Sequence, residues 1–432
     1  MRNSLVTTLS KKPLATQQVD IPAGYKQTEL GVIPEDWDVK ALQAICKAPI
    51  TYGIVQCGPH VENGVPYIRV SDMNSRELDI TEMLRTSPSI AALFSRSKVE
   101  EGDVVYALRG KLGHVRMIFR PLAGANLTQG TARISPLEKI SNRYLFWTLQ
   151  SPKSLEQAAQ EAKGSTFVEI TLANLKRIKV PIPKRFKEQE AIANVLSDTD
   201  VLITGLEQLI AKKQAIKTAT MQQLLTGRIR LTQFAKHPDG TIKGYKSSDL
   251  GHIPEDWEER EIGQFAPLQR GFDLPASKRS EGLYPVVYSN GIVNTHNHFQ
   301  VKGPGVVTGR SGTLGKVHHI ECDFWPHNTS LWVTKFINSD SKFVYYIFKY
   351  IGFERFASGS GVPTLNRNDA HSFKVAIPSS LKEQTAIATV LSDMDAELVT
   401  LEKKLAKVRD IKQGMMQQLL TGRIRLSLDH QP

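Results

Sequence analysis

Two clusters of residues in this 432-residue chain have types and spacing that could support chemistry. The first is 309–316, GRSGTLGK, which resembles a phosphate-binding loop. Such a loop needs glycine five residues before its Gly-Lys pair and Ser or Thr after the lysine, so that backbone N–H groups can cradle phosphates. Arg310 and Val317 occupy those positions here. A strand-turn-strand hairpin with a basic tip is therefore the better interpretation.

The second cluster is rich in histidine and could bind a metal. Zinc is usually held by histidine and cysteine, but structural sites use short fixed spacings that this cluster lacks. We therefore favour histidines that form hydrogen bonds or face phosphate over metal ligands. The cluster comprises His318, His319, Cys322 and His327, with His296 and His298 nearby.

Other catalytic patterns are missing from the sequence. No G-x-G-x-x-G segment follows a strand and opens a helix, and no Asn-Pro-Pro-aromatic segment, the adenine methyltransferase signature, occurs. Glu35-Asp36 and Glu255-Asp256 pair carboxylates, but their position between Pro and Trp suits a docking turn better than acid–base catalysis. We expect a non-catalytic chain that binds no metal and no cofactor itself.

Composition favours a soluble protein with a polyanionic partner. The chain has 55 Lys+Arg against 43 Asp+Glu, a formal net charge of +12, and three cysteines, too few for a disulfide scaffold. No stretch approaches the ~18 apolar residues of a membrane span, and the first residues lack the apolar core of a signal peptide. We therefore expect a cytoplasmic location and no membrane.

The chain contains one unit twice. Residues 25–37 (YKQTELGVIPEDW) and 245–257 (YKSSDLGHIPEDW) are called the head motifs below. Residues 187–231 and 382–426 are identical at 28 of 45 positions, and both end in QQLLTGRIRL. These last ten residues, 222–231 and 417–426, are called the tail motifs. A repeated start and a repeated end therefore frame each copy.

A divergent body lies between these constant parts in each copy. The offset between the copies falls from 220 residues at the head motifs to 195 at the tail motifs, and most of the extra length in the first copy lies between 46 and 109. Residues 85–185 hold 17 basic and 7 acidic residues, and 262–381 hold 12 and 7. Loops that vary and carry basic charge favour nucleic-acid binding, with a solvated basic face as the alternative.

The bodies are expected to be mixed α/β. Residues 103–108 and 305–309 predict strands between glycine-rich turns. Residues 142–160 and 341–356 predict amphipathic helices, whose aromatic residues we assign to the core rather than to base stacking.

The two repeated segments predict long helices that pack against each other. Apolar residues recur at heptad steps without proline, and each segment ends in Thr-Gly. About 33 residues at ~1.5 Å each give a rod of roughly 50 Å. Two separate core helices, one in each domain, are the alternative. Lys213, Lys217 and Lys412 interrupt the seam. The seam residues are Ile192, Leu196, Ile203, Leu206, Ile210 and Leu224, with Ile387, Leu391, Met394, Leu398, Leu401, Leu405, Val408, Met415 and Leu419.

These motifs together resemble the specificity subunit of a bacterial type I restriction–modification enzyme. The resemblance is carried by L-G-x-I-P-x-D-W before each body, by a Gly-Ser turn leading into V-x-I-P, and by K-E-Q-x-A-I-A-x-V-L-S-D-x-D opening a helix that ends in the tail motif. It covers about residues 25–426, and the combination occurs twice in the same order.

The resemblance implies a function and a set of partners. Each body would be a target recognition domain for one half of an asymmetric, bipartite DNA sequence, and the antiparallel helices would set the spacing. The partners would be double-stranded DNA, two methyltransferase subunits that use S-adenosylmethionine, and restriction (motor) subunits that use ATP and Mg. If both domains read the same face of the DNA, half-site centres are expected about one helical turn, ~34–36 Å, apart.

We therefore predict a mixed α/β (α+β) fold with two globular recognition domains, two long antiparallel coiled-coil-like helices and an internal pseudo-two-fold repeat. The expected parts are an N-terminal extension (1–24), a first recognition domain (25–186), a central helix (187–231), a linker (232–244), a second recognition domain (245–381), a distal helix (382–426) and a C-terminal tail (427–432).

Base contacts are expected from loop residues of the usual types, with Arg pairing to guanine and Asn or Gln to adenine. The candidates are Arg109, Lys111, Arg116, Asn126 and Gln129 in the first copy, and Asn290, Asn294, Asn297, Arg310 and Lys316 in the second. Two other classes of function stay open at this point: a stand-alone DNA-binding regulator and a two-repeat scaffold protein.

Overall fold

A computed structural model describes residues 21–110, 113–162, 169–358 and 364–427. Most of the expected extension 1–24 therefore lies outside the described residues. Contacts divide the chain into two compact units, Met1–Thr204 with Ala406–Pro432 and Gly205–Leu405. None of the helices in the described ranges combines the length and the apolar character that crossing a bilayer requires.

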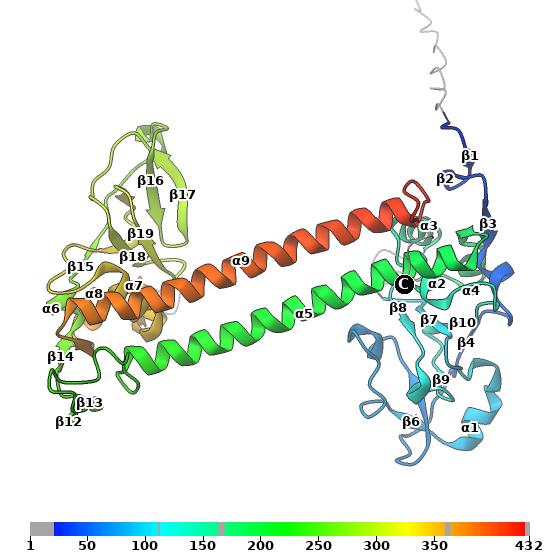
Figure 1. Cartoon of the computed structure of the whole chain (residues 1–432), viewed down its shortest axis with the longest axis horizontal. Coiled ribbons are helices and arrows are strands. Elements are labelled where there is room, and N and C mark those ends of the chain that lie inside the picture. The colour runs from blue at the N-terminus through cyan, green and yellow to red at the C-terminus, as the bar shows by residue number, and fades with distance from the viewer. Residues whose placement is uncertain (1–20, 111–112, 163–168, 359–363, 428–432) are drawn as a thin grey trace, which may run out of the picture. The chain divides into compact units, whose positions relative to one another are not determined.

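The first unit combines the first body with parts of two long helices (Figure 1). It holds the first part of α5 (Phe186–Leu225) and the last part of α9 (Leu381–Leu419). Its strands are β1 (Tyr25–Thr28), β2 (Gly31–Pro34), β3 (Trp37–Ala41), β4 (Thr51–Tyr52), β5 (Val65–Ile68), β6 (Arg85–Thr86), β7 (Val104–Ala107), β8 (Val115–Met117), β9 (Asn126–Leu127), β10 (Thr131–Ile134) and β11 (Lys179–Pro183). Its shorter helices are α1 (Pro88–Leu93), α2 (Asn142–Leu149), α3 (Pro152–Glu161) and α4 (Leu172–Arg177).

The second unit contains the remaining parts of the two helices and the second body. It holds the last part of α5 and the first part of α9. Its strands are β12 (Tyr245–Ser248), β13 (Gly251–Pro254), β14 (Trp257–Glu261), β15 (Leu268–Arg270), β16 (Tyr284–Tyr288), β17 (Gly291–His296), β18 (Gly305–Gly309), β19 (Val317–Ile320), β20 (Trp325–Pro326), β21 (Ser330–Val333), β22 (Ala357–Ser358), β23 (Thr364–Leu365) and β24 (Lys374–Pro378). Its shorter helices are α6 (Ile262–Phe265), α7 (Ser341–Ile351) and α8 (Arg367–His371).

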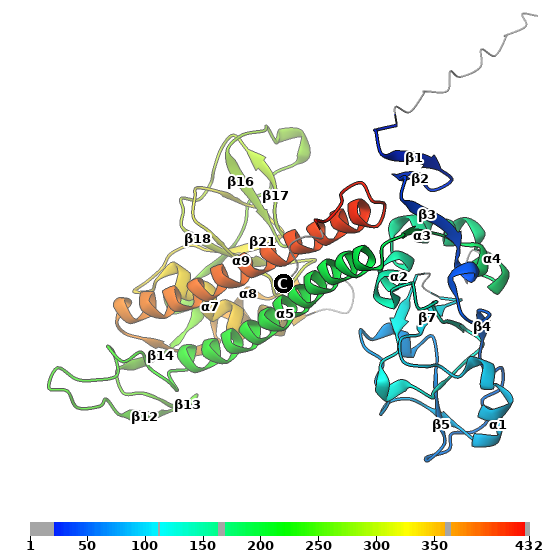
Figure 2. The same ribbon diagram turned by 45° about the vertical axis from the view of Figure 1, so that its right-hand side comes forward.

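The two bodies share one topology although their sequences diverge. A four-stranded antiparallel sheet has the order β4-β10-β7-β8 in the first unit and β15-β21-β18-β19 in the second. A second sheet, β6-β5-β9 or β17-β16-β20, contains one antiparallel and one parallel pair in both units. The last strand of each body returns to the strand that the head motif begins, so β3 pairs with β11 and β14 with β24. Figure 2 labels β3 in the first unit and β14 in the second. The predicted mixed α/β repeat is confirmed.

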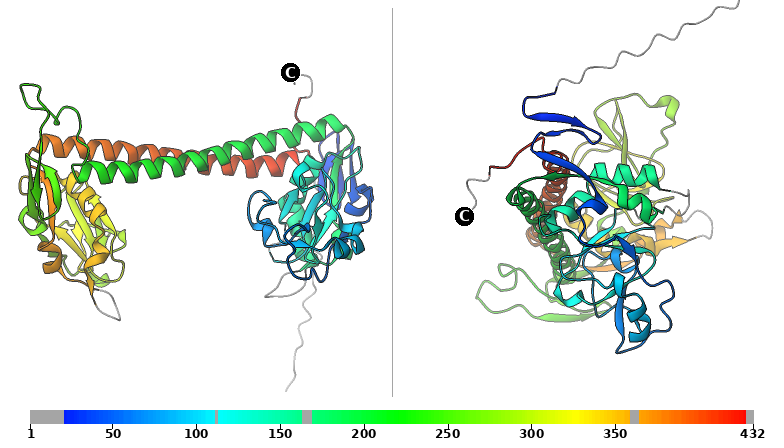
Figure 3. Two further views of the ribbon diagram at one scale, coloured as in Figure 1. Left: turned by 90° about the horizontal axis from the view of Figure 1, so that it is seen from below. Right: turned by 90° about the vertical axis from the view of Figure 1, so that its right-hand side faces the viewer.

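The long helices pack together through the predicted seam (Figure 3). Each predicted seam residue is buried or half-buried, and Leu196 and Leu391 have no exposed surface. In the second unit Lys213 contacts Glu397 at 2.7 Å, and Lys217, one turn later, contacts Asp395. Residue numbers thus rise along α5 while they fall along α9, so the helices run antiparallel.

The polar residues within the seam form ion pairs across it. Lys217 contacts Asp395 in the second unit, and the equivalent Lys412 contacts Asp200 in the first. Asp395 also accepts a hydrogen bond from Tyr346 of the second body at 2.7 Å. Polar seam positions of this kind fix the register of a coiled coil because a shifted alignment leaves a charge unpaired.

Three sequence predictions need correction. The long helices have 40 and 39 residues rather than about 33, because each starts at or before the KEQ segment and continues into the tail motif. The helix predicted over 142–160 is two helices, broken where Ser151 caps a helix with Pro152 in its first turn. The helix predicted over 341–356 ends at Ile351, because Gly352 has a positive φ of 71° and a 3-10 turn follows.

Replacing Lys217 with alanine is expected to lower the free energy of unfolding by about 1–3 kcal/mol, because Asp395 loses its cationic partner in a largely buried site. Urea unfolding followed by circular dichroism measures the change. The matched control is Lys213→Ala in the preceding turn of α5, whose ion pair with Glu397 is more exposed and contributes about 0–1 kcal/mol. Equal losses in both variants would contradict a register role for Lys217.

Candidate nucleic-acid interface and helix junctions

The tail motif of α5 packs onto the head motif of the second copy. Gly227 turns the chain with a φ of +69°, and a Cβ there would lie 2.6 Å from Cδ of Pro254 and 3.2 Å from the ring of Trp257. Glycine is therefore required both for the backbone conformation and for the close approach. The Tyr245 hydroxyl donates to the carbonyl of Gly227 at 3.2 Å, where the helix leaves acceptors unpaired.

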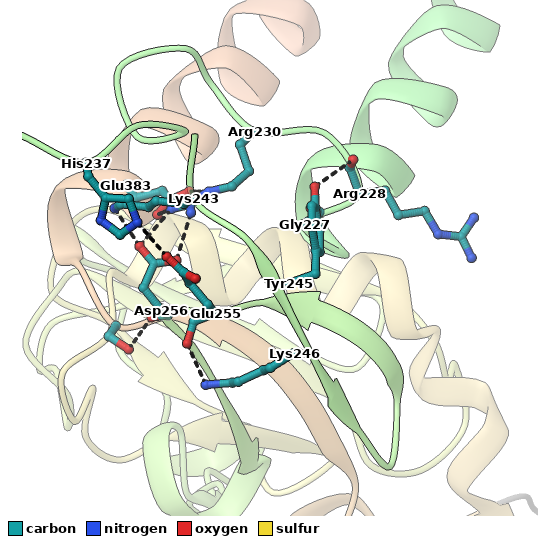
Figure 4. Close-up of polar contacts among 11 residues, drawn as sticks. Gly227, Arg228, Arg230, His237, Lys243, Tyr245, Lys246, Glu255, Asp256 and Glu383 are labelled. Atoms are coloured by element: carbon teal, nitrogen blue, oxygen red, sulfur yellow. Dashed lines mark hydrogen bonds and ion pairs between the residues drawn. The ribbon is translucent and has the colours of Figure 1, made fainter. Parts of the chain in front are cut away.

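Arg230 then clamps the junction together (Figure 4). Its guanidinium donates to Oδ1 of Asp256 in the head motif at 2.7 Å and to Oε2 of Glu383 in the first turn of α9 at 2.6 Å. The Arg230 and Glu383 side chains are 6% and 3% exposed. Burial opposes ionisation of Asp256, but hydrogen bonds from Lys243 and Arg230 outweigh it and lower the pKa of Asp256. Asp256 therefore faces Arg230 as a carboxylate at neutral pH.

The first unit repeats this junction with the tail motif of α9. Arg425 donates to Oδ1 of Asp36 at 2.9 Å and to Oε2 of Glu188 at 2.8 Å, and its hydrogen bond lowers the pKa of Asp36. Gly422 has the same φ of +69°, and a Cβ there would lie 2.5 Å from Cδ of Pro34. The head motifs thus receive helix ends, as the docking-turn interpretation predicted.

A glutamine fixes the start of each long helix to its body. Gln384 accepts a hydrogen bond from the backbone N–H of Asp340 at 2.9 Å and donates to the carbonyl of Pro378 at 2.8 Å. Gln189 makes the equivalent bonds with Ser141 at 2.8 Å and Pro183 at 2.9 Å. Both amides are buried, so the KEQ segment joins helix and body in a fixed geometry.

The Arg230→Gln variant is expected to lose about 3–5 kcal/mol of unfolding free energy, because it leaves the Glu383 carboxylate buried without its charge partner. Thermal and urea unfolding measure the loss. Arg228→Gln, two residues away at an exposed position with no ion pair in the described ranges, should change stability by no more than about 0.5 kcal/mol. A loss in Arg230→Gln as small as in the control would contradict the clamp.

Each body presents an equivalent pair of loops. The β7–β8 and β18–β19 hairpins confirm the hairpin interpretation of the glycine-rich segments. Beside them, the N–H of Ile170 donates to the carbonyl of Leu108, and that of Leu365 to the carbonyl of Arg310, both at 2.8 Å. Ile170 and Leu365 thus bring equivalent segments of the two bodies to the base of the hairpin. The residues just before these segments, 163–168 and 359–363, lie outside the described residues.

The structure leaves two of the first-body candidates for DNA contacts exposed and holds two others inside the fold. Arg109 and Gln129 are exposed, and a Cβ on Gly130, which follows Gln129, would lie 2.6 Å from Nε of Arg109, so the two candidates lie near each other. Lys111 lies outside the described residues. These exposed positions can meet a ligand without rearrangement.

Two other first-body candidates are held inside the fold. Arg116 donates to the carbonyls of Met73 and Ser75, both at 2.6 Å, which commits its guanidinium to that turn. Asn126 is 2% exposed and donates to the carbonyl of Ala91 at 3.2 Å. We do not retain Asn126 as a base contact, because its amide is buried and satisfied.

The second-body candidates gather on two neighbouring hairpins. Asn290, Asn294 and Asn297 belong to the β16–β17 hairpin or its end, and Arg310 and Lys316 to the β18–β19 hairpin. Ideal Cβ atoms on Gly309 and Gly312 would lie 3.3 Å and 3.8 Å from the Ser289 side chain, so the tips are adjacent. Asn290, Asn297 and Lys316 are exposed, and Arg310 is half-buried. Asn294 is half-buried and donates to the Tyr288 hydroxyl at 3.3 Å.

The histidine cluster forms hydrogen bonds within the second body. His319 pairs with Ser341 at 3.2 Å, and His327 with Thr329 at 3.1 Å. Burial is the main cause of the lowered pKa of His318, His319 and His327, which keeps them neutral. In the described part of the chain, no group of three or more His, Cys, Asp or Glu side chains is placed to hold a metal ion.

Sequence reasoning missed the clamp arginines. Arg230 and Arg425 lie in the repeated RIRL segment, and their partners lie in the repeated PEDW and KEQ segments. The signal was available, since a cation and two carboxylates recur in three separate motifs of both copies. Nothing in the sequence indicated that the three motifs meet.

Comparison with known proteins agrees with this architecture. The Type I restriction modification DNA specificity domain model matches residues 34–218 and 254–408. The chain is 24% identical to the Type I restriction enzyme MjaVIII specificity subunit of Methanocaldococcus jannaschii, over 91% of this chain and 94% of that one. It is 28% identical to the Type I restriction enzyme EcoBI specificity subunit of Escherichia coli, over 56% of this chain and 51% of that one.

A solved structure shows the same fold. The type I restriction–modification S subunit from M. genitalium superposes with a TM-score of 0.58 at 18% identity, covering 89% of this chain and 96% of that chain. Since the family model spans both bodies and much of both long helices, the resemblance inferred from the motifs is confirmed. The chain belongs to the type I restriction–modification specificity family and is the non-catalytic DNA specificity subunit of such a system.

Proposed function

We propose that each body recognises one half of an asymmetric, bipartite DNA sequence and that the paired helices fix the gap between the halves. The observation that carries this proposal is a contrast within the repeat. The junction contacts of Arg230 and Arg425 are the same in both units, whereas the bodies differ in sequence and loop length. Constant parts can hold a geometry while variable parts determine the sequence recognised.

The exposed loop chemistry differs between the bodies. In the first body Leu93 is 77% exposed and Val55 is 53% exposed, both within the longer segment 46–109. In the second body Ile292 and Val293, next to Asn294 on β17, are each 57% exposed. Apolar side chains can contact thymine methyl groups and Asn can pair with adenine, so unlike loops favour unlike half-sites.

We assign DNA contacts to the candidates that the fold leaves accessible. The basic surplus of both bodies would bind phosphates and make affinity fall with salt. Arg side chains can specify guanine, and Asn or Gln can specify adenine. The assigned residues are Arg109 and Gln129 in the first body, and Asn290, Asn294, Asn297, Arg310 and Lys316 in the second.

The chemistry would take place on partner subunits. Each copy of the repeat offers one docking surface, and the two surfaces are equivalent. This supports the binding of two methyltransferase subunits per chain. These subunits would bring S-adenosylmethionine, and restriction (motor) subunits would use ATP and Mg. The chain described here would orient its partners on DNA, in the cytoplasm.

Deleting the gene from its host is expected to abolish one split, asymmetric N6-methyladenine motif, since no other part of the complex would select the site. Long-read sequencing of genomic DNA measures the motif. Complementation with Arg310→Ala should relax the sequence requirement in one half of the motif only. The expected loss is about 1–3 kcal/mol of discrimination between bases at one base pair. The other half serves as the internal control. An unchanged methylome with expressed partner subunits would favour a regulator or a scaffold.

Inserting one heptad into the middle of both α5 and α9 is expected to lengthen the gap between half-sites by about three base pairs. Seven residues add ~10.5 Å of helix while retaining the seam. The methylated motif again measures the outcome. The control is the same seven residues inserted at Gly240, an exposed turn in the linker, which should leave the gap unchanged. A changed half-site would contradict a spacing role for the helices.

A further inference from the structure

Some residues that are identical in the two tail motifs have side chains that take no part in the junctions, although the carbonyl of Arg228 accepts a hydrogen bond from Tyr245. Arg228 and Arg423 are exposed and form no ion pair in the described ranges of the chain. Ile229 and Ile424, which follow them, are 57% and 53% exposed. The clamp explains why the neighbouring residues Arg230 and Arg425 are the same in both copies. Folding does not require an exposed Arg-Ile pair at the same place in both copies.

Each of these arginines lines a groove beside its junction. In the second unit the end of α5, the β12–β13 hairpin, α7 and β24 surround a cavity of about 750 Å³. Leu225, Leu250 and Ile253 contribute its aliphatic surface, with Tyr350 and Ile351 from the body. Leu250 is 45% exposed, so the aliphatic surface is accessible.

The first unit has a smaller groove of about 300 Å³ at the equivalent place. One wall differs, because Ser151 and Pro152 stand where the second body has Tyr350 and Ile351. Most of the wall that the tail motifs supply is the same in both grooves. The identical pairs are Leu225 and Leu420, Thr226 and Thr421, and Arg228 and Arg423.

The charge of the shared wall is positive. The lysines in both grooves are already paired, Lys374 with Asp249 at 2.7 Å and Lys179 with Glu29 at 3.0 Å. Arg228 and Arg423 are therefore the uncompensated cations common to the two grooves. The larger groove is also lined by Arg355, an exposed arginine, whereas Arg423 is the single arginine among the described residues that line the smaller groove. An aliphatic surface beside an arginine without an ion pair is complementary to a protein segment with an apolar anchor and a carboxylate.

We propose that the two grooves are equivalent docking sites for an acidic, aliphatic-anchored segment of the methyltransferase subunit, one copy in each groove. This inference rests on the proposed function and specifies which surface the partner uses. The repetition supports it, because two grooves that share the same tail-motif wall, in a chain with otherwise divergent bodies, suit one partner bound twice. DNA is a poorer occupant, since phosphates need rows of cations, whereas the unpaired cation that the two grooves share is a single arginine beside leucines.

The test uses the full chain with purified methyltransferase subunit and no DNA, and measures stoichiometry by light scattering and affinity by titration. The wild-type chain should bind two copies. Arg228→Glu and Arg423→Glu should each bind one copy tightly, and the double variant should bind with a dissociation constant raised about tenfold or more at both sites. Lys335→Glu, an exposed charge reversal outside the grooves, is the control.

Each outcome decides between the proposals. A wild-type chain that binds no methyltransferase overturns the docking part of the proposed function and the grooves with it. A double variant that binds two copies with unchanged affinity overturns only the grooves. Loss of DNA affinity without loss of methyltransferase binding identifies them as a nucleic-acid surface, and an equal loss in Lys335→Glu attributes the effect to net charge. If the charge reversals unfold the chain, Arg228→Gln with Arg423→Gln removes the same two charges and applies the same test.

Discussion

An arginine just beyond each long helix holds together three segments that are far apart in sequence. Arg230 joins the end of α5 to the head motif through Asp256 and to the first turn of α9 through Glu383. The head motif runs into β14, and β14 pairs with β24, which leads directly into α9. Helix pairing, hairpin position and closure of the body therefore depend on one set of charge-assisted hydrogen bonds, which are stronger than neutral ones because both partners are ionised.

The repeat keeps the residues that set the geometry constant in both copies and lets the bodies vary. The seam ion pairs and the two clamps use identical residues in both copies, since a spacing device fails when its register slips. The bodies keep only their topology, with the order β4-β10-β7-β8 matched by β15-β21-β18-β19. Loops attached to such a sheet can change length without moving the strands that carry them.

The sequence predicted the repeated architecture well because periodicity and internal identity survive without knowledge of contacts. The seam from Ile192 to Leu419 followed from heptad spacing alone. The broken helix at Ser151-Pro152 was missed although the capping signal was present, because amphipathicity continued across it. The candidate DNA contacts were harder still. Asn126 has the right residue type for a base contact, but its burial depends on Ser97 and Ala91, which lie far away in the chain. Long-range burial has no local signature.

Each body is closed by groups that lie outside it. The tail of α9 completes the junction of the first copy, and the tail of α5 completes that of the second. The last helix of the chain therefore ends against the first strands of the chain, and the two copies close each other in a ring of contacts. Because the arginine, the two carboxylates and the turn glycine of each junction are the same residue types in both copies, the bodies between them can differ in length and sequence without changing those contacts. Neither junction can form without a segment from both copies.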